Sequence, residues 1–298
     1  MLAHVETLQE IVDRAKPGVL GVAVCDVRTG QVEGLNLKRP FPLRSVFKAF
    51  LAAGILSDVD AGKLSLGQKV TLAPGDITDG VGPVDHSRGG TFSVRELLRA
   101  AVIPSDNSAA DALLVLYGGP DKLTEWLKQH GIEGIRIDRD ERAIARDEHG
   151  VPADLDPGRN ASALAPQISA AAHRQAFAAA LTDPRDTATP EGAIAFLVKL
   201  QQGQLLSADS TKLLLGWLRE VSTGPGRLKA GVPSGTKLAH KTGTSGECDG
   251  VTLATNDIGL ATLPDGRTLA IAAFLTASPA AESKREALLA ACARAGLK

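Results

Sequence analysis

The sequence has few cysteines and no cluster of metal-binding side chains. Cys25, Cys248 and Cys292 are an odd number of thiols at spacings unlike those of metal sites, and the six histidines form no H-x-x-x-H pair. We therefore expect no metal and no other cofactor. Cys25 and Cys292 lie in apolar runs, where a free cysteine behaves as a small buried hydrophobe, whereas Cys248 is expected to be exposed.

The sequence also lacks a strong charge of either sign and a long apolar run. Its net charge is -1, which indicates no basic surface for nucleic acid, and no stretch approaches the ~20 apolar residues of a membrane span. Residues 1–15 are typical of an amphipathic helix, so no export signal is visible. We expect neither nucleic acid nor a membrane as a partner.

The order of the predicted elements indicates an α/β fold. The 298 residues are enough for one large domain or for two lobes that share a cleft. Helical patterns fill the middle of the chain, and β-rich runs occur near both ends, at 18–36, 237–245, 250–263 and 268–277, before a last helix at 282–295.

Elements of this kind at both ends can combine into one antiparallel sheet covered by helices. Residues 1–44 and 204–298 would then form an α/β sheet lobe. Residues 45–203 would form an inserted all-helical lobe, with a cleft between the two.

Three short motifs occur once each, in a fixed order: Ser45-Val46-Phe47-Lys48, Ser105-Asp106-Asn107 and Lys241-Thr242-Gly243. A serine hydroxyl becomes a nucleophile when a neighbouring base removes its proton. Ser45 opens an apolar, buried-looking helix with Lys48 one turn further on, whereas the second S-x-x-K match, at 234–237, lies in a Pro-Gly turn. The alternative for Lys48 is a surface lysine whose aliphatic stem packs on the protein.

The other two motifs can complete an acyl-transfer site. Ser105 can pass a proton to a leaving nitrogen while Asn107 binds an amide of the substrate, although S-D-N alone is also typical of a helix N-cap. Lys241 can lower the pKa of a neighbouring lysine, and Gly243 lets a peptide-like ligand approach the strand edge. The N–H groups of Ser45 and Thr244 are candidates for an oxyanion hole.

These motifs resemble the class A serine β-lactamases of the penicillin-recognising serine hydrolases. The resemblance runs from about Val5 to the end of the chain and includes four further segments, at 41–44, 118–120, 185–190 and 254–257. It implies a five-stranded antiparallel sheet flanked by helices, with the helical lobe inserted. It also implies a monomer, exported to the periplasm or secreted, that acts on small-molecule β-lactams.

The resemblance assigns roles to individual residues. Ser45 is the acylated nucleophile, Lys48, Ser105 and Lys241 take part in catalysis, and the substrate is bound by Asn107, Thr242, Gly243 and Thr244. Arg227 matches a position that pairs with the substrate carboxylate in some members; its alternative is a solvated arginine.

The family's omega loop is represented by Arg139, Glu141 and Asp186, but here it is considerably enlarged, over 139–186. Arg139 and Asp186 would form its structural ion pair, and Glu141 would activate the deacylating water. Counting back from Asp186 would instead place His173 at the base position. Ala145 replaces the asparagine that helps to hold this water and Arg142 replaces a proline, so one hydrogen bond that positions the water in the family is absent here.

Three functions therefore remain open. The first is a β-lactamase that hydrolyses the lactam amide through an acyl-enzyme at Ser45. The second is a D-alanyl peptidase or esterase of the same superfamily, against which Glu141 argues. The third is a β-lactam-binding protein that deacylates slowly, which Ala145 keeps possible.

Overall fold

The two ends of the chain form one antiparallel sheet, as predicted. The computed structural model describes residues 6–156 and 160–297. Five strands follow the order β2-β1-β11-β10-β8, and the short β9 pairs with the end of β10. Their bounds are β1 (Val19–Asp26), β2 (Val32–Leu35), β8 (Lys237–Thr244), β9 (Glu247–Cys248), β10 (Val251–Thr262) and β11 (Thr268–Ser278).

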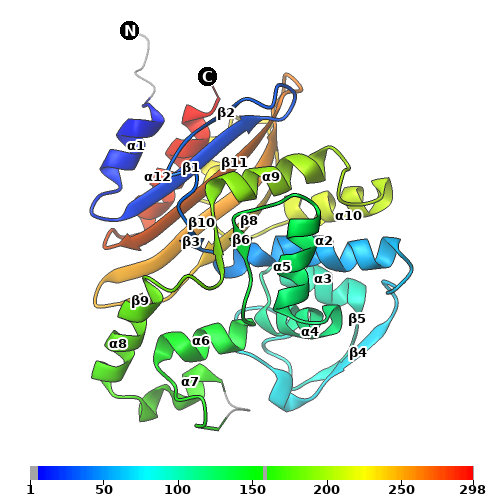
Figure 1. Cartoon of the computed structure of the whole chain (residues 1–298), viewed down its shortest axis with the longest axis vertical. Coiled ribbons are helices and arrows are strands. Elements are labelled where there is room, and N and C mark those ends of the chain that lie inside the picture. The colour runs from blue at the N-terminus through cyan, green and yellow to red at the C-terminus, as the bar shows by residue number, and fades with distance from the viewer. Residues whose placement is uncertain (1–5, 157–159, 298) are drawn as a thin grey trace.

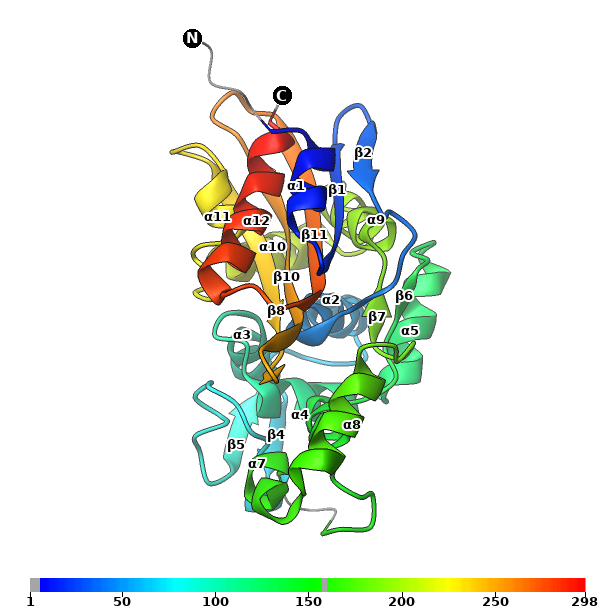
Figure 2. The ribbon, with the colours of Figure 1, turned by 90° about the vertical axis from the view of Figure 1, so that its left-hand side faces the viewer.

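Helices cover both faces of this sheet. Successive side chains of a strand point to opposite faces, so Val22 and Val24 pack toward α1 (Leu8–Arg14) and α12 (Glu282–Ala295). Ala23 and Cys25 belong to the larger core on the other face. Figure 2 shows α1 and α12 side by side on their face. Burial on both faces explains why β10 and β11 are apolar along most of their length.

The middle of the chain contains short strands as well as helices. Its first helix, α2 (Phe47–Asp60), is buried on nearly all sides, as the sequence predicted. The other helices before the omega region are α3 (Val94–Val102), α4 (Asn107–Tyr117) and α5 (Pro120–Gln129). A hairpin joins β4 (Lys69–Leu72) to β5 (Gly90–Ser93), and a small sheet joins β3 (Phe41–Pro42), β7 (Thr187–Ala188) and β6 (Ile135–Arg136).

Two observations bear on the proposed lobes. The short strands show that 45–203 is not built of helices alone. Helix α9 (Pro190–Gln201), within that range, packs against β1 and β11 of the central sheet, while α10 (Ala208–Arg219) packs against β8 and α2. The division into two lobes stays a prediction.

The enlarged loop folds into helices of its own. It contains α6 (Glu141–His149), α7 (Ala161–Leu164) and α8 (Ala170–Ala180), which lie together at the lower end of the molecule in Figure 1. Asp140 and Ser169 accept hydrogen bonds from the first turns of α6 and α8, so each helix has an N-cap. Helix α8 reaches β9, where Cys248 Sγ lies 4.0 Å from His173 Nδ1.

The cysteines are free thiols; Cys25 and Cys292 are buried and Cys248 is half-buried. Within 6–156 and 160–297, no helix is long and apolar enough to cross a membrane. The same residues contain no group of three or more His, Cys, Asp or Glu side chains suited to a metal ion.

Candidate active site

The three motifs meet where the 3₁₀ turn η1 (Arg44–Val46) enters α2. Ser45 lies in η1, and Lys48 lies in the first turn of α2, with its Nζ 3.0 Å from Ser45 Oγ. Ser105 comes from the loop between α3 and α4, and its carbonyl oxygen accepts a hydrogen bond of 2.8 Å from Lys48 Nζ. Lys241 on β8 donates to Ser105 Oγ at 2.9 Å. A continuous set of proton donors and acceptors therefore surrounds Ser45.

Both lysines of the site are completely buried. Lys48 and Lys241 are each 0% exposed, so the alternative of a surface lysine is wrong for Lys48. Burial lowers the pKa of Lys241 well below its ordinary value, and the charge of Lys48 lowers it further. A lysine with a lowered pKa can exchange a proton with the Ser105 hydroxyl that it contacts.

Glu141 is the first residue of α6, and its carboxylate faces Ser45. Oε1 accepts hydrogen bonds from Ser45 Oγ at 3.1 Å and lies 2.9 Å from Lys48 Nζ. Burial raises the pKa of this carboxyl, but the neighbouring Lys48 and Arg44 outweigh burial and hold the pKa below its ordinary value. The carboxylate is therefore ionised and able to accept a proton. His173 lies on α8, where it stacks on His149 with ring centroids 5.4 Å apart.

The strand β8 and its surroundings present polar groups beside Ser45. Asn107 Oδ1 accepts from Lys48 Nζ at 2.5 Å, and Asn107 Nδ2 donates to the carbonyl of Asp79 at 2.6 Å. A side chain at Gly243 would place its Cβ 2.6 Å from the carbonyl oxygen of Leu43. Glycine at this position therefore allows β8 to lie directly against the segment that precedes Ser45.

Arg227 is a buried part of this region and not a solvated arginine. Only 3% of it is exposed, and its Nη2 donates to Thr244 Oγ1 at 2.8 Å. Its Nη1 donates to the carbonyl of Asn256 at 3.0 Å, and its Nε contacts Glu286 at 3.1 Å. The guanidinium thus holds the end of β8 through its hydrogen bond to Thr244, and it adds positive charge to the site.

Two buried acids that the sequence reading did not use fasten the loop around Ser105. Asp106 caps α4 by accepting from Ala109 N at 2.8 Å, and its other oxygen accepts from Val84 N at 2.6 Å. Asp85 Oδ1 accepts from Ser108 N at 2.7 Å. Burial raises the pKa of Asp106 to about 6. The N-cap alternative for S-D-N is therefore true of Asp106, and it coexists with the exposure of Ser105 to the site.

A third missed acid, Asp111, holds the start of α6. Its oxygens accept from the backbone N–H groups of Glu141 at 2.8 Å and of Arg142 at 3.2 Å. Burial, then the charges of Asp140 and Glu141, raise the pKa of Asp111 to about 8. One acid within the otherwise apolar helix α4 was the signal in the sequence, because such a residue needs a buried polar partner.

The ends of the enlarged loop are joined by the expected pair. Arg139 Nε donates to Asp186 Oδ2 at 2.6 Å, and the same guanidinium contacts Asp147 and Asp183. Arg142 donates to the carbonyl of Ile77 at 3.0 Å. Ala145 packs on the small apolar cluster of the loop, which includes Val151, Ala161 and Leu164.

The sheet, the helices that cover it and the Ser-Lys pair at the start of a buried helix are the arrangement of a serine hydrolase. A model of the beta-lactamase enzyme family matches residues 3–297. The extended-spectrum beta-lactamase PER-1 of Pseudomonas aeruginosa is 35% identical over 283 residues, 94% of this chain and 82% of the relative. Beta-lactamase VEB-1 of the same organism is 31% identical over 90% of this chain and 81% of the relative.

Solved structures agree with this comparison. A beta-lactamase from Chitinophaga pinensis superposes with a TM-score of 0.81 at 31% identity, over 96% of this chain and 95% of the other. An ancestral class A beta-lactamase gives a TM-score of 0.79 at 34% identity, with 97% of both chains covered. The chain belongs to the beta-lactamase enzyme family, as a serine β-lactamase of class A.

Proposed function

We propose that the protein hydrolyses the amide bond of β-lactams through an acyl-enzyme at Ser45, and that Glu141 is the base of deacylation. The observation that carries the proposal is the double contact of Ser45 Oγ, which lies 3.0 Å from Lys48 Nζ and 3.1 Å from Glu141 Oε1. A nucleophile within hydrogen-bond reach of two candidate bases is suited to both halves of the reaction.

In acylation, Ser45 Oγ attacks the lactam carbonyl carbon and gives up its proton to Lys48 Nζ, 3.0 Å away. The C–N bond then breaks, and the ring nitrogen takes a proton from Ser105, which regains one from Lys48 Nζ 3.5 Å away while Lys241 holds the Ser105 hydroxyl in place. The 2.9 Å contact between Lys241 Nζ and Ser105 Oγ supports this route. In deacylation, Glu141 takes a proton from water and the water oxygen attacks the ester carbon. The bond between that carbon and Ser45 Oγ then breaks, and Glu141 gives the proton to Ser45 Oγ.

The remaining residues bind substrate in this proposal. The N–H groups of Ser45 and Thr244 hold the oxyanion, and Asn107 binds the side-chain amide of the substrate. The substrate lies along the edge of β8, where Thr242, Gly243 and Thr244 bind it. Arg227, which contacts Thr244, supplies a positive charge near the substrate carboxylate. A monomer exported to the periplasm or secreted is also proposed, on the family resemblance alone.

The two alternatives, a D-alanyl peptidase or esterase and a slowly deacylating β-lactam-binding protein, differ from this proposal in the deacylation step. A peptidase of the superfamily normally lacks the Glu141 base, and a slow binder would need that base to be misplaced. The position of the Glu141 carboxylate, 3.1 Å from Ser45 Oγ, favours turnover over both.

Incubation with a chromogenic cephalosporin, followed by mass spectrometry of quenched samples, tests the proposal. Sustained turnover with a transient adduct on Ser45 is expected. One stoichiometric burst with a permanent adduct would identify a slow binder, and release of D-alanine from peptides without β-lactam turnover would identify a peptidase.

A further inference from the structure

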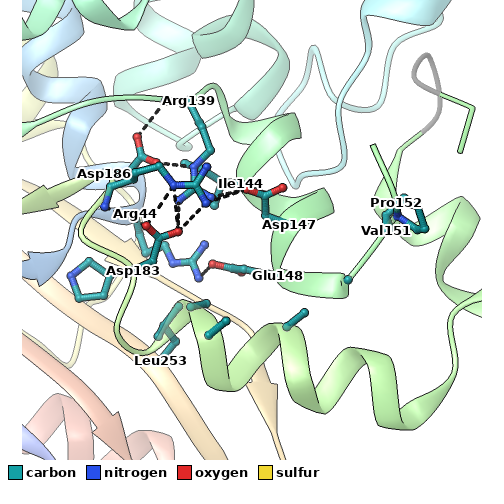
Figure 3. A pocket seen from close by; sticks show the side chains of 16 residues that line it. Arg44, Arg139, Ile144, Asp147, Glu148, Val151, Pro152, Asp183, Asp186 and Leu253 are labelled. Atoms are coloured by element: carbon teal, nitrogen blue, oxygen red, sulfur yellow. Dashed lines mark hydrogen bonds and ion pairs between the residues drawn. The ribbon is translucent and has the colours of Figure 1, made fainter. Parts of the chain in front are cut away.

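The residue before Ser45 is a buried arginine that reaches into the enlarged loop. Arg44 is 8% exposed, and its backbone has φ of 51°, in the left-handed region. Its Nη2 forms an ion pair with Glu148 on α6, whose side chain is 16% exposed. Figure 3 shows the two side chains directed at one another beside the cluster around Arg139.

Helix α6 carries the proposed deacylation base at one end and the partner of Arg44 near the other. Glu141 and Glu148 are seven positions apart, which is close to two turns, so both side chains project from the same face of the helix. That face is held at its start by Lys48 and Ser45 through Glu141. It is held two turns later by Arg44 through Glu148. The nucleophile's own neighbour is therefore an anchor for α6.

Packing on this side of α6 is incomplete. A cavity of about 490 Å³ lies between α6, α8 and the sheet, and its lining includes Ile144, Val151, Ala176 and Leu253. Side chains that border a cavity lack the dispersion contacts that hold a helix elsewhere. The ion pair of Arg44 with Glu148 crosses this region, next to that of Arg139 with Asp186.

The charge of Arg44 also acts on Glu141. Burial lowers the pKa of Arg44 to about 10, so the guanidinium is charged at neutral pH. Its charge is one of the causes that lower the pKa of Glu141. Other groups that face Glu141 are Lys48 on α2, Lys241 on β8 and Asp111 on α4, and Arg139 faces Arg44.

We propose that the Arg44–Glu148 ion pair positions α6, and with it Glu141, for deacylation of the acyl-enzyme, so that Arg44 and Glu148 are positioning residues. The inference rests on the proposed function, because it assigns a second element to the same site. It predicts that loss of the pair slows deacylation much more than acylation, since η1 packs mainly against β8 and β10 and α2 against α4 and α10.

The test compares Arg44→Gln, Glu148→Gln, the double variant and Arg44→Lys with the parent enzyme. Acylation and deacylation rates are measured separately with a chromogenic cephalosporin, by rapid quenching and mass spectrometry. Each Gln variant is expected to deacylate about 10-fold to 100-fold more slowly, with acylation within about threefold of the parent. The double variant should deacylate only slightly more slowly than either single variant, because both substitutions remove the same ion pair. Arg44→Lys should recover part of the deacylation rate.

Glu220→Gln is the matched control, because it breaks an ion pair with Arg99 whose side chains are 48% and 51% exposed. This control should behave as the parent. In Arg44→Gln, the acid limb of the deacylation profile should also move to higher pH, because the pKa of Glu141 rises when a neighbouring positive charge is lost. Glu148→Gln should not move the acid limb to higher pH, since Arg44 keeps its charge.

Unchanged deacylation in both Gln variants, or equal losses of acylation and deacylation, would overturn the inference. Thermal unfolding of every variant is recorded, and if Arg44→Gln does not fold, Glu148→Gln and Arg44→Lys decide the result by the same rates. A parent enzyme that forms no adduct would contradict the proposed function itself. A parent that turns over beside unaffected variants would contradict only the role of the pair.

Discussion

The proposed acylating groups and the proposed deacylating base are held in different ways. Ser45, Lys48 and Lys241 come from η1, α2 and β8, which belong to the core, and both lysines are 0% exposed. Glu141 belongs to the enlarged loop, and its helix is held by the side chain of Asp111 and by the pairs Arg44–Glu148 and Arg139–Asp186.

This difference has consequences for robustness. Apolar packing is spread over many contacts, so single surface changes leave it intact. Hydrogen bonds and ion pairs depend on a few side chains and on their ionisation. A buried charge that loses its partner destabilises the folded state. We therefore expect the acylating groups to stay in place under substitutions and pH changes that displace Glu141.

The largest effect is expected from Ser45→Ala, which removes the nucleophile from the acylating side. The variant should fold and should form no covalent adduct with any penicillin or cephalosporin, because no other described serine has a buried lysine one helical turn further on. Mass spectrometry after quenching measures this directly. A mass increase equal to one intact antibiotic would refute the assignment of Ser45.

Glu141→Gln should separate the two halves of the reaction. The substitution preserves shape and removes basicity, so Ser45 should still be acylated while the adduct accumulates and turnover falls by about 100-fold or more. Steady-state kinetics and quenched mass spectra measure both quantities. His173→Ala is the control and should change turnover far less, since its ring stacks on His149. The reverse pattern would assign the base to His173.

Arg227→Ala tests whether the buried arginine takes part in substrate binding. It should lower kcat/KM for β-lactams with a ring carboxylate by about 10-fold to 100-fold. It should also lower Tm, because the arginine is buried among Thr244, Asn256 and Glu286. Glu286→Gln removes the ion pair and keeps the contact with Thr244, so its kcat/KM should stay close to that of the parent. Unchanged kinetics in Arg227→Ala would leave carboxylate recognition to Lys241, Thr242 and Thr244.

The last prediction concerns Asp111 and the pH dependence of stability, with no direct effect on the site's chemistry. Its pKa is about 8 in the folded protein and 3.8 ordinarily, so between these values the folded state holds a proton that the unfolded chain releases. This group therefore lowers the free energy of unfolding as pH rises, by up to about 1.4 kcal/mol per pH unit. Asp111→Asn should flatten the slope between pH 5 and pH 8 in urea titrations. Asp121→Asn, at the exposed start of α5, should leave it unchanged, and an equal slope in Asp111→Asn would contradict the expectation.

Features encoded over short distances were predictable from the sequence. Examples are the capping box of Ser93 and Glu96, the glycine that ends α4 at Gly118 and the Thr-Pro start of α9 at Thr189. Each depends on side chains a few residues apart, which a helix brings together on its own. The class of fold was predictable for a similar reason, because β-rich runs at both ends leave few ways to bury their apolar sides.

Contacts between distant segments could not be read in the same way. Asp85 meets Ser108 across 23 residues, Asp111 meets Glu141 across 30, and Ser45 meets Glu141 across 96. The packing of α9 against β1 and β11 is a further contact of this kind, since an apolar helix does not specify which surface covers it.

The sequence by itself determined the family, the order of the three motifs and the neighbourhood of Ser45 and Lys48, because a helix sets the distance between residues three apart. The tertiary structure alone decided that Arg44 pairs with Glu148, that Asp111 holds the start of α6 and that Arg227 is buried beneath β8. Those pairings depend on how the chain packs after its elements have formed. Charged side chains of equal type occur throughout the sequence, and only packing selects which of them lose water and therefore need a partner.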